Sequence, residues 1–313
     1  MLKSMNDKDS LLWGFILATF GAVLFSSKGI FVKFSYQYGL STELVLFYRM
    51  LLSVPVFIII TIRAVRRRSI QNISNMDRFK LIFCGFMGYY LAGFLSFYSL
   101  HYISVQLERV ILFSYPALVV LGTAILARKL PTLKMIVAAI LTYLGVFIIF
   151  GHEFLSGGGN ALSSGNDVIF GALMVGVSAL VFAVSVLVSK NLIAAYGSAF
   201  YTGSVWTVST IFIVLHTLIF YALTQGNSLD IPSVDAFWIL VALSMIGTVI
   251  PSFMISEAIA RIGPERTAIS GTVGPIATSM IAISFLGEEF TIYHGAALIL
   301  CSAGIILIAR KNA

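Results

Sequence analysis

Apolar blocks long enough to cross a membrane follow one another along the whole chain, with short polar segments between them. A hydrocarbon core about 30 Å thick needs roughly 20 helical residues at 1.5 Å each. Allowing for tilt, ten segments reach that size, near 11–33, 43–63, 80–101, 106–127, 134–151, 168–190, 199–222, 236–259, 267–286 and 292–309. The pattern therefore predicts ten transmembrane helices.

Composition supports an all-α integral membrane protein. Hydrophobic residues make up 59% of the 313 residues and charged residues 11%, with a mean hydropathy of +0.98. Soluble domains carry about 25% charged residues, so this chain has too little polar surface for a water-soluble globule. The net charge of +7 lies in short basic clusters between apolar blocks, as membrane topology requires, which argues against a nucleic-acid partner. The amino-terminal MLKSMNDKDS lacks the features of a cleaved signal peptide.

Lysine and arginine positions predict the orientation. With a cytoplasmic N-terminus, 16 of the 20 basic residues lie at cytoplasmic ends and loops, which leaves Lys28, Lys33, Arg49 and Arg109 within or at the outer ends of spans. The opposite loops contain no Lys or Arg, and their acidic residues are Glu153, Asp167, Asp230, Asp235, Glu288 and Glu289. We therefore expect a multi-pass protein of the bacterial cytoplasmic (inner) membrane with both termini in the cytoplasm.

Weak internal similarity predicts two halves. A shift of 159 residues lays 97–150 onto 256–309 without a gap and matches Ile103 with Ile262, and Gly145 with Gly304. A shift of 157 matches Gly14 with Gly171. We expect a first repeat over 1–151, a Gly/Ser-rich linker over 152–167 and a second repeat over 168–313. Because each half has an odd number of spans, the two would be inverted about a central cavity, where secondary transporters bind substrate.

The segment GTVGPIATSM (271–280) places a proline inside an apolar span, and Pro116 occupies the matching position in the first half. Proline frees a backbone carbonyl one turn earlier and bends a helix. In lipid such a defect is tolerated where other helices cover it or where it lines a polar cavity. Gly271 and Gly274 would let a helix or a ligand approach Pro275 closely. A kink that only improves packing remains open beside the cavity-lining interpretation.

The residues at this point resemble a known family. The run RIGPERTAISGTVGPIATSMIAISFLGEEFTIYHGAALILCSAGIILI is similar to the EamA branch of the drug/metabolite transporter superfamily. The positions that match its pattern are Pro275, Gly287, Glu288, Gly295 and Gly304, while the first half keeps Pro116 and Gly145 but has Lys129 in place of Glu288. The resemblance implies ten helices in two inverted bundles and the transport, usually outward, of small metabolites, commonly amino acids or related compounds.

Charges inside apolar spans are the candidate functional groups, because each needs a partner, a wet cavity or a route to the interface. Arg49 could pair with Glu43, with Glu108 or with a substrate carboxylate, and Lys28 could either snorkel or stay deep. Glu108 and Arg109 are sequence neighbours and so point about 100° apart on a helix. The residues expected to bind substrate are Arg49, Tyr90, Tyr98, Glu108, Trp206, Gly271 and Pro275.

Glu257 is the candidate for proton coupling. It lies four residues before Arg261, however, a spacing that also allows an ordinary ion pair within one helix. Span three carries an aromatic row at intervals of four that includes Tyr90 and Tyr98, which would pack against lipid or neighbouring helices unless those hydroxyls face the centre.

The sequence contains no phosphate-cradling glycine loop, no metal-ligand spacing and no nucleophile–base arrangement. We therefore expect no catalytic residue, metal or cofactor, and a substrate or ion gradient, most plausibly H⁺, as the energy source. The predicted function is secondary active transport of a small molecule by alternating access. The alternatives are an intramembrane enzyme acting on a lipid-linked substrate and a channel. Oligomeric state is left open.

Overall fold

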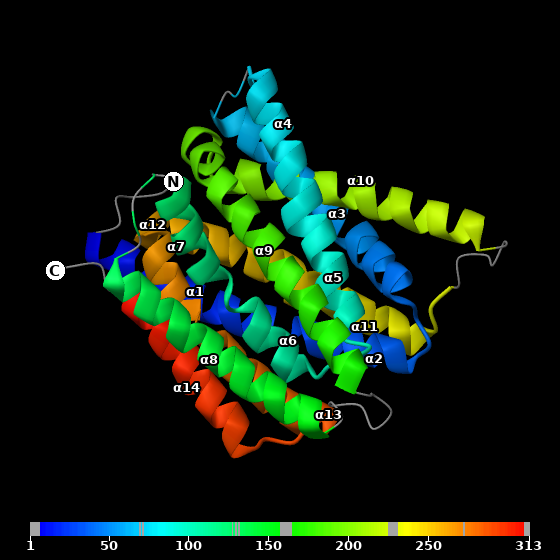
Figure 1. Cartoon of the computed structure of the whole chain (residues 1–313). Helices are drawn as coiled ribbons and strands as arrows, with labels where there is room; N and C mark the ends of the chain where they lie inside the picture. Colours follow the sequence, from blue (N-terminus) through cyan, green and yellow to red (C-terminus); the bar gives the residue numbers. More distant parts are fainter. Residues whose placement is uncertain are drawn as a thin grey trace.

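The computed structural model describes residues 7–309 apart from 69, 71, 127, 129, 131, 157–164, 225–230 and 272. Lys129, Asp230, Thr272 and half of the predicted Gly/Ser-rich linker, residues 157–164, lie outside the described residues, while the rest of that linker belongs to helices. The regular elements in the described part are all helical (Figure 1). In chain order they are α1 (Asp7–Ser26), α2 (Lys28–Gln37), α3 (Thr42–Arg68), α4 (Asn75–Cys84), the π-helix η1 (Gly85–Leu91), α5 (Ala92–Ser99), α6 (Val105–Leu112), α7 (Tyr115–Leu126), α8 (Leu133–Ser156), α9 (Gly165–Tyr196), α10 (Ser198–Leu223), α11 (Val234–Ser244), the π-helix η2 (Met245–Val249), α12 (Ile250–Gly271), α13 (Val273–Leu286) and α14 (Ile292–Ala309).

Eight helical segments of the described chain are long and apolar enough to cross a membrane. They correspond to the first eight predicted spans, and two shorter apolar helices, Val273–Leu286 and Ile292–Leu307, follow them. The predicted count of ten is therefore supported for eight spans by length and composition. At the ninth, α12 runs through the expected loop near 260–266 to Gly271, Thr272 lies outside the described residues, and α13 holds the 14 residues that follow.

The distribution of side chains is that of a protein in lipid. Large apolar residues stand exposed along α9 at helical spacing, among them Phe170, Leu173, Val177 and Leu180. Small polar residues of the same helix, such as Ser178 and Ser185, are buried against other helices. This is the reverse of a soluble helix, whose polar face is turned to solvent. Interfaces with small and hydroxyl-bearing residues are typical of membrane helices, because lipid gives no hydrophobic drive for association.

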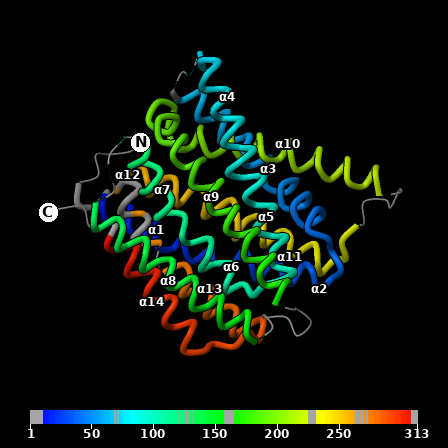
Figure 2. Tube along the Cα trace, in the orientation of Figure 1, coloured from blue at the N-terminus to red at the C-terminus, as the bar shows by residue number. Residues whose placement is uncertain are grey.

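Helices from the two halves of the chain pack in pairs. The main pairs are α1 with α12, α8 with α14, α3 with α10 and α5 with α9. The α8 and α14 pair, green and red, runs side by side in both views (Figures 1 and 2). The first residue of α1 and the last residue of α14 lie on the same side of the bundle (Figure 1).

Glycine contacts between these pairs are reciprocal. A Cβ on Gly145 of α8 would lie 2.8 Å from the Ala297 carbonyl oxygen, and one on Gly304 of α14 would lie 2.6 Å from the Ala138 carbonyl oxygen. In the same way, Gly14 of α1 packs on Ile262. Its counterpart Gly171 of α9 packs on Ile103, where an added Cβ would lie 2.8 Å from the side chain. In each set, the second contact joins the counterparts of the two residues in the first, as the sequence shifts match them, which is what a pseudo-two-fold axis would produce.

Helix irregularities also recur in both halves. The π-helices η1 and η2 interrupt the third and eighth predicted spans. In the fourth span, α6 ends at Leu112, whose carbonyl Pro116 cannot bond, and α7 begins at Tyr115. Pro116 therefore lies in the first turn of a new helix, where a missing N–H costs little, and does not bend a continuous helix as the sequence predicts. In the ninth span, Thr272 lies outside the described residues, and both Pro116 and Pro275 are buried.

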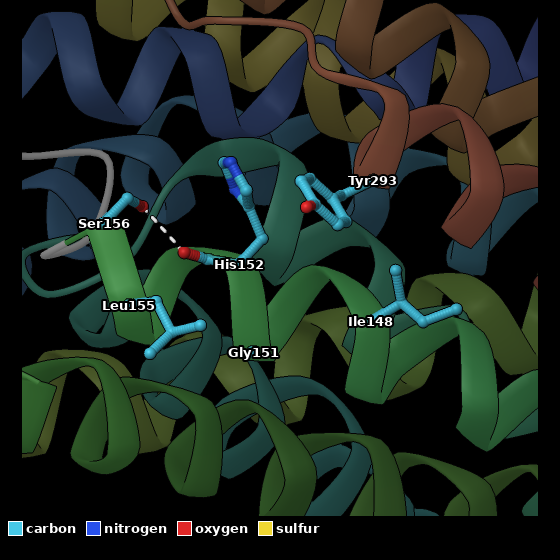
Figure 3. Close-up of a pocket in the computed structure, with 6 residues that line it drawn as sticks. All are labelled: Ile148, Gly151, His152, Leu155, Ser156 and Tyr293. Carbon is cyan, nitrogen blue, oxygen red and sulfur yellow. Dashed lines mark hydrogen bonds between the residues drawn. The ribbon is translucent and has the colours of Figure 1, made fainter.

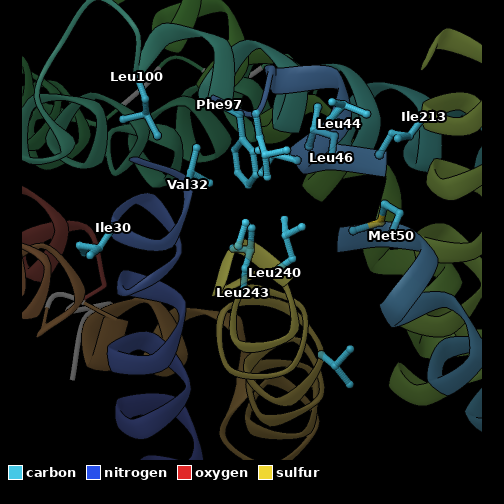
Figure 4. Packing of buried hydrophobic residues seen from close by; sticks show 14 of the residues in the cluster. Ile30, Val32, Leu44, Leu46, Met50, Phe97, Leu100, Ile213, Leu240 and Leu243 are labelled. Carbon is cyan, nitrogen blue, oxygen red and sulfur yellow. The ribbon is translucent and has the colours of Figure 1, made fainter. Parts of the chain in front are cut away.

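The largest apolar cluster closes the seam between α2, α3, α5 and α11. Leu240 and Leu243 of α11 point toward Val32 and Phe97 in Figure 4. In the predicted orientation α2, α5 and α11 are the outer halves of their spans and α3 begins at the outer side, so the cluster would seal the outer end of the seam.

Candidate functional site

A helix break at Ser27, between α1 and α2, brings polar groups to the seam. The Ser26 hydroxyl donates to the Gly274 carbonyl oxygen at 2.8 Å, and the Thr278 hydroxyl donates to the Ser26 carbonyl oxygen at 3.3 Å. Residues next to the break in the first span are therefore hydrogen-bonded to α13. The carbonyls of Ser26 and Gly274 face hydroxyl donors and not lipid, which is the condition for irregular structure at membrane depth.

Lys28 and Glu108 form a buried ion pair at this break. Lys28 Nζ lies 3.8 Å from Glu108 Oε1 and 3.3 Å from Ser96 Oγ. Ser96 donates a short hydrogen bond to the same carboxylate. The pair and Ser96 join α2, α5 and α6. Of the two alternatives for Lys28, the structure shows a buried side chain and not one that snorkels to the interface.

Arg109 approaches the break from the adjacent position on α6. Its Nη2 donates to Ser26 Oγ at 3.2 Å, and its Cζ lies 5.9 Å from the centroid of the Phe25 ring. Arg109 Nε has no hydrogen-bond partner among the described residues. Glu108 and Arg109 thus point to different groups, as their spacing predicts, and both remain buried.

Arg49 of α3 is buried without a carboxylate. Its guanidinium carbon lies 4.6 Å from the centroid of the Phe97 ring and 5.5 Å from that of Trp206. Its Nε and Nη2 have no hydrogen-bond partner within the part of the chain that the structure describes. Lys28 Nζ lies 5.4 Å from the same Phe97 ring, which places the two cations close together. Ring faces attract cations but leave N–H donors unsatisfied.

The predicted outer end is closed by a second charged group. Glu288 accepts hydrogen bonds from the backbone N–H groups of Val105, at 2.9 Å, and Gln106, at 3.4 Å, at the start of α6. Lys33 Nζ lies 3.5 Å from Glu288 Oε1. Glu153 accepts from the hydroxyl of Ser104, which caps α6. Carboxylates are favoured at a helix N-terminus. These contacts join α6 to α2, to α8 and to the segment between α13 and α14.

The structure brings together three of the predicted substrate residues and their surroundings. Arg49 and Trp206 are neighbours, and Glu108 contacts Lys28 and Ser96 beside them. Gly271 of α12 faces Phe113, which lies at the break between α6 and α7. A Cβ on Gly271 would lie 3.6 Å from the Phe113 ring. Pro275 follows Gly274, whose carbonyl oxygen accepts the hydrogen bond from the Ser26 hydroxyl.

The contacts of the remaining predicted residues lie elsewhere. Tyr90 packs against Phe212 and His216 of α10, and Tyr98 packs against Phe94, His101 and Tyr102. They form the expected aromatic row. Glu257 pairs with Arg261 Nε at 2.8 Å along one helix, and its side chain is 46% exposed.

Sequence reasoning left Lys28, Ser26, Ser96 and Arg109 out of the site. Lys28 carried a usable signal, since it lies about 17 residues into the first predicted span, too deep for an easy route to the surface. The serines carried none, because a hydroxyl in a membrane helix most often bonds a carbonyl of its own preceding turn.

A shallow pocket of 440 Å³ lies away from this cluster, at the outer end of α8. The ring of His152 stacks on that of Tyr293 at 4.8 Å beside it (Figure 3). Its lining is Ile148, Gly151, His152, Leu155, Ser156 and Tyr293. None of these residues contributes a charged group to the seam.

Comparisons with known proteins give a family model, a relative and a similar fold. The model of the EamA-like transporter family matches twice, over residues 12–151 and 169–310. The "Uncharacterized transporter YcbK" of Bacillus subtilis (strain 168) is 30% identical over 277 residues, which cover 88% of this chain and 86% of that one. A solved structure titled "Crystal structure of protein" superposes with a TM-score of 0.64 at 15% identity, over 94% of this chain and 96% of that chain.

Proposed function

Because the chain belongs to the EamA-like transporter family, we propose that it is a secondary active transporter that carries a small metabolite across the membrane between two inverted halves. The observation that carries the proposal is the buried cluster of Lys28, Arg49, Glu108 and Arg109 at the helix breaks. Charge at membrane depth is expensive and marks substrate paths.

Alternating access is the proposed mechanism. The seam is sealed on its outer side by the apolar cluster around Phe97 and Leu240 and by Glu288 at the start of α6. Transport requires these contacts to separate while contacts at the opposite end form. The broken helices are suited to such motion, because each break lets one half-helix tilt without unfolding the other.

Several finer features belong to the same proposal. The substrate is a small metabolite such as an amino acid or a related compound, and movement is outward. The protein occupies the bacterial inner membrane with both termini in the cytoplasm, as the basic residues between spans favour. If protons drive transport, Glu257 is the candidate from the sequence. Its pairing with Arg261 is also what a structural role would produce.

Comparison of cells that express the wild-type protein with cells that express Arg49→Gln tests the proposal. We expect mass spectrometry of the medium to find at least one small metabolite that accumulates only with the wild type. The exposed Arg63→Gln on the same helix is the matched control and should behave as wild type. In proteoliposomes, that compound should exchange saturably. Equal metabolite concentrations in the media of all three strains, or flux that rises linearly with substrate concentration, would contradict a carrier.

A further inference from the structure

The buried seam carries more positive than negative charge. Lys28, Arg49 and Arg109 are 6%, 2% and 8% exposed, whereas the one carboxylate among them, Glu108, is 1% exposed. Lys28 lies within electrostatic reach of all three other groups. Because Glu108 compensates one cation at most, the cluster holds an excess of two positive charges if all four groups are ionised.

Among the described residues, no further carboxylate pairs with this excess. The ion pairs in the described residues join Lys28 to Glu108, Lys33 to Glu288, Lys80 to Asp77 and Arg261 to Glu257. None includes Arg49 or Arg109. Each of these two arginines also keeps at least one N–H donor unsatisfied. Uncompensated cations and unsatisfied donors are both costly when buried. A ligand that supplies negative charge and hydrogen-bond acceptors would account for both.

Space for at least a methyl group is free next to Arg49. Gly93 of α5 faces its guanidinium, and a Cβ built on Gly93 would meet only Arg49 Nη2, at 3.8 Å, among the described residues within 4 Å. The Phe97 and Trp206 rings lie beside the same guanidinium. Arg49 therefore presents a planar pair of donors to a space that has aromatic rings on its border.

We propose that this seam binds a small organic anion, with a carboxylate or similar oxyanion on the Arg49 guanidinium, and that the transported molecule has no ammonium group. This inference rests on the proposed function and narrows its substrate class to the related compounds that carry an anionic group, which leaves out amino acids themselves. A planar guanidinium matches a carboxylate through two parallel hydrogen bonds. An ammonium group would need an acceptor of its own, and Glu108 is already shared by Lys28 and Ser96. A zwitterionic amino acid would leave the excess of positive charge in place.

Charge-selective labelling beside Arg49 tests the inference. The full-length protein carries Gly93→Cys, with the buried Cys84 and Cys301 replaced by alanine, in proteoliposomes. The probes are two methanethiosulfonates of similar size, the anionic sulfonatoethyl and the cationic trimethylammonioethyl reagent, each normalised to its rate with a free thiol. A cleft of one charge sign raises the rates of oppositely charged partners by about 10- to 1,000-fold. We expect the anionic reagent to react at least about tenfold faster.

The variants assign the selectivity to Arg49. Arg49→Gln in the same background should remove most of the preference, Arg49→Lys should keep it, and the exposed Arg63→Gln should not change it. Equal rates, or faster reaction of the cationic reagent, would overturn the inference while leaving an open seam and the proposed transport intact. Reaction of neither reagent from either side would contradict the proposed function itself.

Thermal unfolding of the protein with all its natural residues gives a second readout that does not depend on the cysteine. The probes share one skeleton: 3-phenylpropionate is an anion, phenylalanine a zwitterion and phenethylamine a cation. We expect the largest increase in Tm with 3-phenylpropionate, and no such increase in Arg49→Gln. Equal Tm values with all three compounds, or a larger increase with the zwitterion or the amine, would count against a net anion.

Discussion

The contact between α8 and α14 gives a sharp stability prediction. Gly145→Ala would place a methyl group 2.8 Å from the Ala297 carbonyl oxygen, and Gly304→Ala would place one 2.6 Å from the Ala138 carbonyl oxygen. Ordinary contact begins near 3.4 Å, so the helices must separate by about 0.6 Å and 0.8 Å, respectively. Side-chain atoms lie nearer still, Cys301 Sγ to the first methyl group and Thr142 Oγ1 to the second, but the two carbonyl oxygens are backbone atoms, which cannot rotate away. Overpacking of this kind costs about 1–3 kcal/mol.

The assay is equilibrium unfolding of the purified protein in mixed micelles, with Gly176→Ala as the control. A Cβ on Gly176 of α9 would meet nothing within 4 Å. Removing a glycine from a helix there should stabilise the protein by about 0.5–1 kcal/mol. Because the two contacts are reciprocal, we expect Gly145→Ala and Gly304→Ala to destabilise by similar amounts. Stabilisation by either substitution, comparable with the control, would refute the close packing of these helices.

Three further predictions concern the charged groups. Lys28→Gln leaves the Glu108 carboxylate buried without its cation and should lower the free energy of unfolding by about 3–5 kcal/mol. The double variant with Glu108→Gln should restore most of this loss. If the effects of the two substitutions simply add, Lys28 and Glu108 do not interact. Glu288→Gln should weaken the contacts that close the outer end of the seam and increase labelling of a seam cysteine from the outer side several-fold. Glu289→Gln, at a residue with an exposed side chain, should not change the labelling. Equal labelling of the two variants would exclude Glu288 from the contacts that close the seam. Glu257→Gln should cost only about 0.3–0.5 kcal/mol, since its partner lies one turn away at a partly exposed position; loss of pH-dependent transport in this variant would instead make it the coupling site.

The sequence predicted the outline of the fold because its signals are local. Eight of the expected spans follow from runs of apolar residues, and Arg49 and Glu108 stood out because a charge in such a run is rare. Pro116 marked an irregular span, at the break between α6 and α7. Whether a proline bends a helix or ends it depends on whether neighbouring groups satisfy the backbone at a full break, and those neighbours come from distant segments.

The rest depends on packing between distant segments. The aromatic row of the third span was predictable, but its partners on α10 were not. A helix face is fixed only when its neighbours are known, and the π-helix η1 rotates the residues that follow it. Ser96 and Gly93 therefore face the charges, whereas Tyr90 and Tyr98 contact other rings. Likewise, Lys28 remained ambiguous until Glu108 lay within 3.8 Å of it.

The central claim is that a seam containing Arg49 opens alternately to the two sides, with its outer end closed in this structure. Cysteines at Lys33 and Glu288, joined by a short thiol-specific cross-linker, test it through labelling of Gly93→Cys by a membrane-impermeant maleimide. The account predicts that the cross-linked protein is labelled from the inner side only, and that a reductant that cleaves the linker restores labelling from the outer side. Labelling from the outer side at the same rate before and after cleavage would contradict it.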